Sequence, residues 1–336
     1  MPKVISLVPQ QRFTQGRIEV PSDWDLIFLL EHGEKDIIEA CKGADYLLVT
    51  AAFPPVTESV LQNIPSVRLL QVFGAGFDKV NVDAAHKLKL PVANTPGQNA
   101  STVAEFTLGV LVSLQRKMLK SDREVKAGNH ILIKQELVKT GLKEIKGTRV
   151  GLVGLGTIGR LVARLLNILG ARVSYYDPFR LPESDEDDLG VTYCSLQELL
   201  QHNEVISLHL PLNNDTRSMI GKEELASMQP EALLINTSRG EVVDQVALAE
   251  ALEDGVIGGA AVDTFFPEPP PADHPLLNLS GTAAERVILT PHIAGVTAGS
   301  FARMLKEAVE NIQQTEEGGA PKYVVNGILR ARARLA

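Results

Sequence analysis

Short apolar runs alternate with amphipathic segments along the second half of the chain. Residues 148–153 and 172–177 have the composition of buried strands, and between them the apolar residues of 158–170 recur at helical spacing up to a glycine. The alternation continues through strands at 205–210, 232–236, 259–263 and 287–290 and helices at 195–201, 222–228 and 244–252. Because strands that alternate with helices are typical of βαβ units, the pattern predicts an α/β domain with a doubly wound parallel sheet.

The first hundred residues repeat this alternation without a glycine-rich turn. Strands are expected at 4–8, 26–29, 46–50, 69–72 and 92–93, and helices at 34–41 and 58–63. We therefore predict a second, smaller, flavodoxin-like α/β domain. A helix at 103–118 leads from it into the larger half, and a final helix at about 300–317 is long enough to return to it. One domain is placed at 1–98 plus 297–336 and the other at 99–296, with a ligand cleft between them.

Composition and charge narrow the classes of function. No stretch approaches the roughly 20 apolar residues of a membrane span, and the first residues are too short a run for a secretion signal, so we expect a cytoplasmic protein. A net charge of −8 gives no sign of the positively charged surface that binding to nucleic acid or to an anionic membrane requires. Cys41 and Cys194 have no metal-ligand spacing, so no metal site is predicted. The basic tail after Leu329 is expected to be solvated.

A glycine motif marks the turn between the first strand and helix of the larger domain. Gly154 allows a tight turn, Gly156 lets a pyrophosphate approach the backbone, and Gly159 lets the helix pack closely on the sheet. The phosphates would meet the positive end of the helix dipole. The order of strand, glycines, helix and strand therefore predicts a dinucleotide site.

Asp177 closes the next strand, 18 residues after Gly159, near the expected place for a partner of the adenosine ribose. A carboxylate accepts hydrogen bonds from a ribose diol but repels a phosphate on the same oxygen, so NAD is favoured over NADP. Arg180 could neutralise such a phosphate if its loop bent toward it, which leaves the strictness of the preference open.

Three segments at the carboxyl ends of later strands carry titratable side chains, at residues 236–240, 262–269 and 290–295. These segments resemble those of the D-isomer-specific 2-hydroxyacid dehydrogenases. The same resemblance is carried by the glycine turn and by four further motifs, which are GAGFD at 74–78, NTPG at 94–97, VAE at 103–105 and LHLPL at 208–212. That resemblance covers most of the chain. It implies an NAD-dependent oxidoreductase that transfers a hydride between nicotinamide and C2 of a small D-2-hydroxy or 2-keto acid.

The resemblance implies a catalytic arginine, glutamate and histidine, which match Arg239, Glu268 and His292. Reduction of a 2-keto acid needs a fixed cation for the carboxylate and carbonyl, and the planar fork of Arg239 suits that role. The alkoxide that forms needs a proton, and histidine titrates nearest to neutrality, so His292 is the candidate acid. Glu268 would orient the imidazole and favour its charged form.

The resemblance also assigns residues to the two ligands. Asp263 is expected to bond the nicotinamide amide, and a plain turn cap is the alternative. The full set of predicted cofactor contacts is Gly154, Gly156, Thr157, Ile158, Gly159, Asp177, His209, Pro211, Thr216, Thr237, Ser238, Asp263, Ala294 and Gly295. The backbone at Gly74, Ala75 and Gly76 is predicted to form a nest for the substrate carboxylate beside Arg239, and a tight turn is the alternative. The substrate side chain is expected near Phe53.

Some features leave alternatives open. Leu277 stands where many relatives carry tryptophan, and the proline-rich stretch at 267–286 is long, so the particular 2-hydroxy acid is not predicted. Oxidation of phosphite or formate is one alternative, and an NAD-sensing scaffold like the corepressors of this fold is another. The apolar helix at 103–118 resembles the family's dimer surface, which predicts a homodimer, unless it is a buried helix that bridges the domains.

Overall fold

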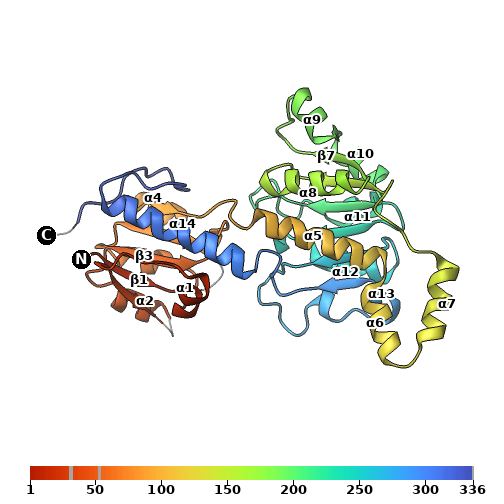
Figure 1. Cartoon of the computed structure of the whole chain (residues 1–336), viewed down its shortest axis with the longest axis horizontal. Coiled ribbons are helices and arrows are strands. Elements are labelled where there is room, and N and C mark those ends of the chain that lie inside the picture. Colours follow the sequence, from red (N-terminus) through yellow and green to blue (C-terminus); the bar gives the residue numbers. More distant parts are fainter. Residues whose placement is uncertain (30–32, 52–53, 335–336) are drawn as a thin grey trace. The chain divides into compact units, whose positions relative to one another are not determined.

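The computed structural model describes residues 1–29, 33–51 and 54–334. The chain divides into two compact units, Met1–Asn99 with Val296–Ala336 as unit 1 and Ala100–Gly295 as unit 2. Each unit contains one parallel β-sheet flanked by helices, which confirms the predicted fold class (Figure 1).

The sheet of unit 2 has the strand order β12-β11-β10-β9-β6-β7-β8 within the described residues. Its strands are β6 (Arg149–Val153), β7 (Arg172–Tyr176), β8 (Val191–Tyr193), β9 (Val205–Leu208), β10 (Leu233–Asn236), β11 (Gly259–Val262) and β12 (Val287–Leu289). The helices are α5 (Ala100–Gln115), α6 (Met118–Lys126), α7 (His130–Thr140), α8 (Thr157–Ile168), α9 (Glu183–Leu189), α10 (Leu196–His202), α11 (Lys222–Ser227), α12 (Gln245–Glu253) and α13 (Gly281–Glu285). From β6 the chain adds β7 and β8 on one side of the sheet and then β9 to β12 on the other, so the direction of strand addition reverses between β6 and β9. Ligands of open α/β sheets bind at such a switch point.

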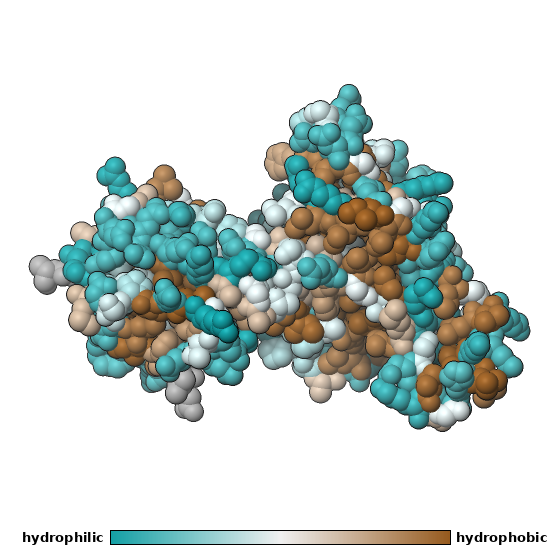
Figure 2. Space-filling view, viewed as in Figure 1, coloured by the Kyte–Doolittle hydropathy of each residue, from teal (hydrophilic) through white to brown (hydrophobic). Residues whose placement is uncertain are grey.

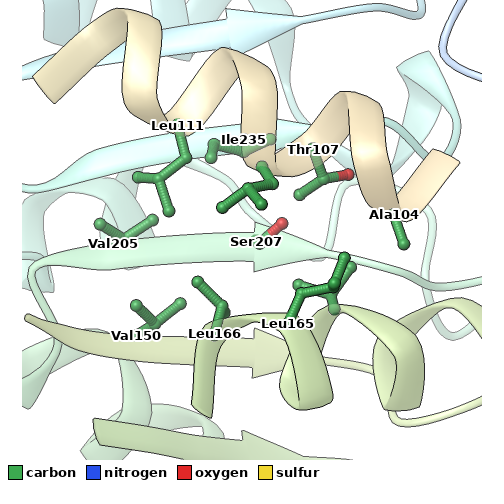
Figure 3. Close-up of a pocket in the computed structure, with 11 residues that line it drawn as sticks. Ala104, Thr107, Leu111, Val150, Leu165, Leu166, Val205, Ser207 and Ile235 are labelled. Carbon is green, nitrogen blue, oxygen red and sulfur yellow. The ribbon is translucent and has the colours of Figure 1, made fainter. Parts of the chain in front are cut away.

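Two apolar layers enclose this sheet. On one side α10, α11 and α12 contribute Leu199, Leu225 and Leu248 to a buried cluster. On the other side, a small void separates α5 and α8 from the strands, and leucine, valine and isoleucine side chains point into it (Figure 3). The two hydroxyls on its lining, those of Thr107 and Ser207, bond to neighbouring protein groups. The void is therefore a packing feature of the core and not a ligand site.

Unit 1 has the strand order β2-β1-β3-β4-β5, which is the flavodoxin-like order. Its strands are β1 (Lys3–Ser6), β2 (Asp25–Phe28), β3 (Tyr46–Thr50), β4 (Leu69–Phe73) and β5 (Val92–Ala93). The helices are α1 (Gln10–Gly16), α2 (Glu34–Ala40), α3 (Glu58–Gln62), α4 (Val82–Lys87) and α14 (Ala298–Glu316). Helix α14 packs on β4 and α1 through Met304, Leu305 and Ile312, so the last helix is part of the first unit.

The helix predicted at 103–118 begins earlier and ends at Gln115, because Lys117 adopts a left-handed backbone with φ of 48°. Eight of its residues are buried and it packs against α8, so it is mainly a core helix of unit 2. The sequence analysis did not anticipate α6, α7 or α9. Helix α6 is short and mostly polar although its few apolar residues share one face, α9 is dominated by acidic residues, and α7 shows no amphipathic stripe.

The basic tail is solvated only in part, because Arg330 and Arg334 are exposed but the arginines at 332 and 334 also bond to unit 1. The guanidinium of Arg332 donates to the carbonyls of Leu88 at 2.6 Å and Val67 at 3.3 Å. Arg334 donates to Asp45 at 2.7 Å, and its other arm lies 3.3 Å from Glu316. Tail arginines that satisfy carbonyls and carboxylates of unit 1 fix this segment on its surface.

Candidate active site

Six predicted site residues or their neighbours follow strand ends of unit 2. They are Gly154 after β6, Asp177 after β7, His209 after β9, Thr237 after β10, Asp263 after β11 and Thr290 after β12. Because all seven strands are parallel, these residues lie along one edge of one sheet. The fold therefore gathers residues that are up to 136 positions apart in the chain.

The glycine turn fits a bound pyrophosphate. A Cβ at Gly154 would lie 2.5 Å from the His209 carbonyl oxygen, and one at Gly159 would collide with the carbonyl of Gly154. A Cβ at Gly156 would meet nothing within 4 Å. The first and third glycines thus allow close packing, and the second leaves open space at the start of α8, beside Thr157 and Ile158. This is the arrangement that a phosphate at a helix N-terminus requires.

The Asp177 carboxylate is fixed beside this turn. Its Oδ2 accepts the backbone N–H of Leu155 at 2.9 Å, and its Oδ1 accepts that of Phe179 at 2.9 Å. Each carboxylate oxygen has two acceptor positions, so capacity remains for a ribose diol. The structure therefore places Asp177 beside the glycine turn, and its contact with the adenosine ribose stays a prediction.

His292 and Glu268 form a close pair. The imidazole Nδ1 lies 2.7 Å from Oε1 of Glu268, and both side chains are partly exposed. The backbone of His292 is left-handed, with φ of 54°, which is uncommon for a residue other than glycine and costs on the order of 1–3 kcal/mol. Surrounding bonds must therefore hold it.

Asp263 supplies those bonds. Its carbonyl accepts the His292 N–H at 2.7 Å. Its carboxylate, which is buried, accepts the Thr290 hydroxyl at 2.6 Å and the N–H groups of Ile293 and Ala294 at 2.9 and 2.8 Å. Burial raises the pKa of Asp263, and these donors oppose that rise. Asp263 thus caps the turn that carries His292, as the alternative interpretation of the sequence proposed. Its carboxylate still has free acceptor positions, and the contact with the nicotinamide amide stays a prediction.

Arg239 lies on a short loop after β10 that a buried asparagine organises. The side chain of Asn236 accepts the N–H and hydroxyl of Ser238 at 3.0 and 2.7 Å and donates to the Arg239 carbonyl at 2.8 Å. A Cβ at Gly240 would collide with the carbonyl group of Phe265. Gly240 therefore lets the arginine loop lie directly on the start of the segment that carries Glu268.

The remaining predicted cofactor residues occupy the same edge. The ring Nε2 of His209 lies 3.0 Å from the Ser207 hydroxyl, and burial lowers its pKa to about 4. Thr216 is buried and donates to the Pro211 carbonyl at 2.7 Å, which closes the loop after β9. The Thr237 hydroxyl lies 3.4 Å from that of Thr107. Ala294 is buried and Gly295 follows it as the last residue of unit 2.

Two residues that the sequence analysis did not select fix the segment around Glu268. Gln245 is buried at the start of α12, where its Nε2 donates to the Thr264 carbonyl at 2.9 Å. Its Oε1 accepts the N–H of Phe266 at 3.1 Å and lies 3.0 Å from Nε2 of His274. His274 is buried too, and its Nδ1 accepts the Leu276 N–H at 3.3 Å. Both ends of the loop that carries Glu268 are therefore tied to one side chain.

The predicted substrate nest lies in unit 1, after β4. Gly74 has φ of 138°, and a Cβ there would lie 2.8 Å from Cβ of Ala51. Its N–H donates to the Thr95 hydroxyl at 2.9 Å, so this donor already has a partner. Ala75 and Gly76 donate to no group of the described residues. The nest thus offers two N–H groups instead of three, and Phe53 lies outside the described residues.

Among residues 1–29, 33–51 and 54–334, no three histidine, cysteine or carboxylate side chains are arranged to hold a metal ion. Within the same residues, no helix is long and apolar enough to cross a membrane.

The chain is similar to known dehydrogenases. Residues 108–294 match the family model for the NAD-binding domain of D-isomer specific 2-hydroxyacid dehydrogenases. A glyoxylate reductase of Korarchaeum cryptofilum is 38% identical over 87% of this chain and 86% of its own. A D-3-phosphoglycerate dehydrogenase of Mycobacterium leprae is 36% identical over 86% of this chain and 52% of its own. The Staphylococcus aureus NAD-dependent formate dehydrogenase, solved with NAD, superposes with a TM-score of 0.81 at 25% identity, over 94% of this chain and 96% of its own.

Proposed function

The chain belongs to the D-isomer specific 2-hydroxyacid dehydrogenase family, and we propose that Arg239, Glu268 and His292 are the residues that carry its reaction. It is an NAD-dependent oxidoreductase that transfers a hydride between nicotinamide and C2 of a small D-2-hydroxy or 2-keto acid. We further propose that acids of the size of glyoxylate are its best substrates, since several relatives are glyoxylate reductases.

The His292–Glu268 pair carries the proposal for the catalytic residues. Because Glu268 engages Nδ1, the ring nitrogen left for substrate is Nε2, which donates its proton to the oxygen of the reduced carbonyl. Arg239 holds the substrate carboxylate with charge-assisted hydrogen bonds and polarises the carbonyl. The backbone N–H groups of Ala75 and Gly76, in unit 1, keep their predicted role as donors to a carboxylate. The nicotinamide supplies the hydride when it is bound.

A keto-acid panel followed by NADH absorbance tests the substrate proposal. Glyoxylate and hydroxypyruvate should give the highest kcat/KM, pyruvate a lower value, and bulkier branched acids lower values still. A clear preference for the branched acids would overturn it. The same panel run on His292→Gln separates the catalytic role from the substrate, because every acid should lose turnover in that variant.

Formate oxidation is the alternative with some support, since two formate dehydrogenases are among the similar structures. Hydride loss from formate leaves carbon dioxide and no alkoxide to protonate, so that reaction makes no use of a carboxylate-paired histidine. Activity with formate or phosphite but with no keto acid would favour this alternative. A protein that binds NADH and reduces none of these acids would instead fit an NAD-sensing scaffold.

The homodimer is proposed on the surface of α6 and α7. Helix α7 exposes Ile131, Leu132 and Val138, each by more than 60%, and apolar side chains gather over this part of unit 2 in Figure 2. An exposed apolar cluster of this kind is typical of an interface with a second copy. Light scattering should give twice the monomer mass, and Leu132→Glu with Val138→Glu should halve it.

The cytoplasmic location stays a prediction.

A further inference from the structure

Arg180 lies three residues after Asp177, where the sequence analysis left open a contact with a phosphate on the adenosine ribose. In the structure its guanidinium faces Glu186 of α9. The Nε donates to Oε1 of Glu186 at 2.9 Å and an Nη donates to Oε2 at 3.0 Å. The two parallel bonds form a fork that occupies one edge of the guanidinium.

Two tyrosines hold this pair in place. The buried Tyr175 donates its hydroxyl to Oε1 of Glu186 at 2.7 Å and accepts the Leu181 N–H at 2.9 Å, which fixes the backbone just after Arg180. The guanidinium also lies over the ring of Tyr193, 5.2 Å from its centroid. Arg180 is therefore directed onto α9 by the hydroxyl, the carboxylate and the ring together.

The pair persists across the working pH range. The Arg180 guanidinium and the Tyr175 hydroxyl lower the pKa of Glu186 to about 2, so its carboxylate stays ionised. The other guanidinium beside the glycine turn, that of Arg160, donates to the Leu155 carbonyl at 3.2 Å and lies 3.8 Å from Asp185. Both cations near the predicted ribose position thus already have acidic partners.

We propose that Glu186 sets the choice of cofactor together with Asp177. Asp177 repels a phosphate on the adenosine 2′-oxygen, and Glu186 withholds the guanidinium that would otherwise compensate for it. NAD is preferred because the chain both places a negative charge at the ribose and keeps Arg180 away from it. The inference needs only the cofactor site and is independent of the keto acid proposed above.

Direct binding tests this role without any turnover. The Kd values for NADPH and NADH are measured by fluorescence titration for the wild type and for Glu186→Gln, in which the amide can still accept from Tyr175 but loses the charge that holds Arg180. We expect NADPH to bind about tenfold more tightly in this variant, because one charge-assisted bond becomes available, while NADH changes less than twofold. The gain should shrink in 0.5 M salt.

The matched control is Glu183→Gln. Glu183 lies on the same helix with an oxygen 3.9 Å from Arg180 and is strongly exposed, so its removal deletes an equal charge without opening the fork. NADPH affinity should change less than twofold in this control. The double variant Glu186→Gln with Arg180→Ala should return NADPH affinity to the wild-type value.

Asp177→Asn is also added to the wild type and to each variant, and the same Kd values are measured in this second background. Repulsion between Asp177 and the phosphate of NADPH then cannot hide the effect of Arg180. A gain of fivefold or more in either background that requires Arg180 supports the proposal. A smaller gain, or one that survives Arg180→Ala or equals that of Glu183→Gln, overturns it. Thermal midpoints check folding, and if Glu186→Gln is unfolded, Glu186→Asp, which keeps the charge but shortens its reach, is judged by the same criterion.

Discussion

Nδ1 of His292 and Oε1 of Glu268 lie 2.7 Å apart although they come from different segments, one after β12 and one after β11. The contact depends on a histidine in the left-handed region and on a loop fixed at both ends. The pair leaves one imidazole nitrogen for chemistry, and the protein's own bonds determine which one.

Replacement of His292 by Gln should lower kcat for keto-acid reduction by about a hundredfold or more, because the proton donor is lost. Glu268→Gln can still accept from Nδ1 but lacks the charge, so we expect a smaller loss of about tenfold to a hundredfold. Stopped-flow single turnovers and NADH titrations separate the two roles from binding. A His292→Gln enzyme with near-normal single-turnover rates would contradict the assignment.

Asp263→Asn should impair the turn that carries His292. An amide group can replace only one of the two acceptor oxygens, so at least one N–H of Ile293 or Ala294 would lose its partner. We expect about 1–3 kcal/mol of lost stability and a fall in kcat. Denaturant titration and steady-state kinetics measure the two effects, and unchanged stability would show that the cap is dispensable.

Gly240→Ala should displace the Arg239 loop, because the added Cβ collides with the backbone of Phe265. We predict that KM for the keto acid rises and kcat falls, while the Kd for NADH, which Thr237 and Ser238 of the same loop are expected to contact, rises by a smaller factor than KM. The control is Gly109→Ala in α5, where a Cβ meets nothing within 4 Å and the helix should gain about 0.5–1 kcal/mol. Equal kinetics for the two variants would refute the close-packing argument.

Gln245→Ala should loosen the loop of Glu268. The N–H of Phe266 and Nε2 of His274 both lose their partner, which costs about 1–3 kcal/mol per buried group. Turnover should fall with little change in NADH affinity. Val246→Ala, at the exposed neighbouring position, is the control and should leave both unchanged. If Gln245→Ala lowers stability but leaves turnover unchanged, the contacts of Gln245 with Phe266 and His274 stabilise the fold and do not position Glu268.

Stability should rise with pH through the titration of His209. Its pKa in the folded state is about 4, below the value of about 6.5 expected when unfolded, so the unfolded state binds more protons between these values. The contribution of the neutral His209 imidazole to the free energy of unfolding is fully present above pH 6.5 and is lost as the pH falls toward 4. Because the ring is only partly shielded, we expect about 1–2 kcal/mol between pH 7.5 and 4.5. His209→Gln should abolish that difference in denaturant midpoints at the two pH values.

Much of this fold is predictable from the sequence because the strands of unit 2, apart from the three-residue β8, are short apolar runs followed by a turn signal. The strand predicted at 46–50 is β3 itself, and the glycine motif locates the start of α8 within one residue. The carboxyl-end rule then places Asp177, Thr237 and Asp263 along one edge. Periodicity carries this information because burial on the sheet imposes it.

What the sequence could not give are contacts between polar side chains that are distant in the chain. Nothing in the polar segment of α9 marks Glu186 as a buried partner of Arg180 and Tyr175. Likewise, Gln245 and His274 are 29 positions apart, and no spacing rule links a helix start to a loop histidine. Partner choice among such groups depends on three-dimensional proximity, so only coordinates reveal it.

The docked tail has a practical consequence for protein engineering. Truncation before Arg332 would leave three backbone carbonyls in unit 1 without their guanidinium, and loss of Arg334 would strip Asp45 of its ion pair. An affinity tag or fusion partner is therefore better joined beyond residue 334 than substituted for the tail, since a shortened protein would lack the arginines that pair with these carbonyls and with Asp45.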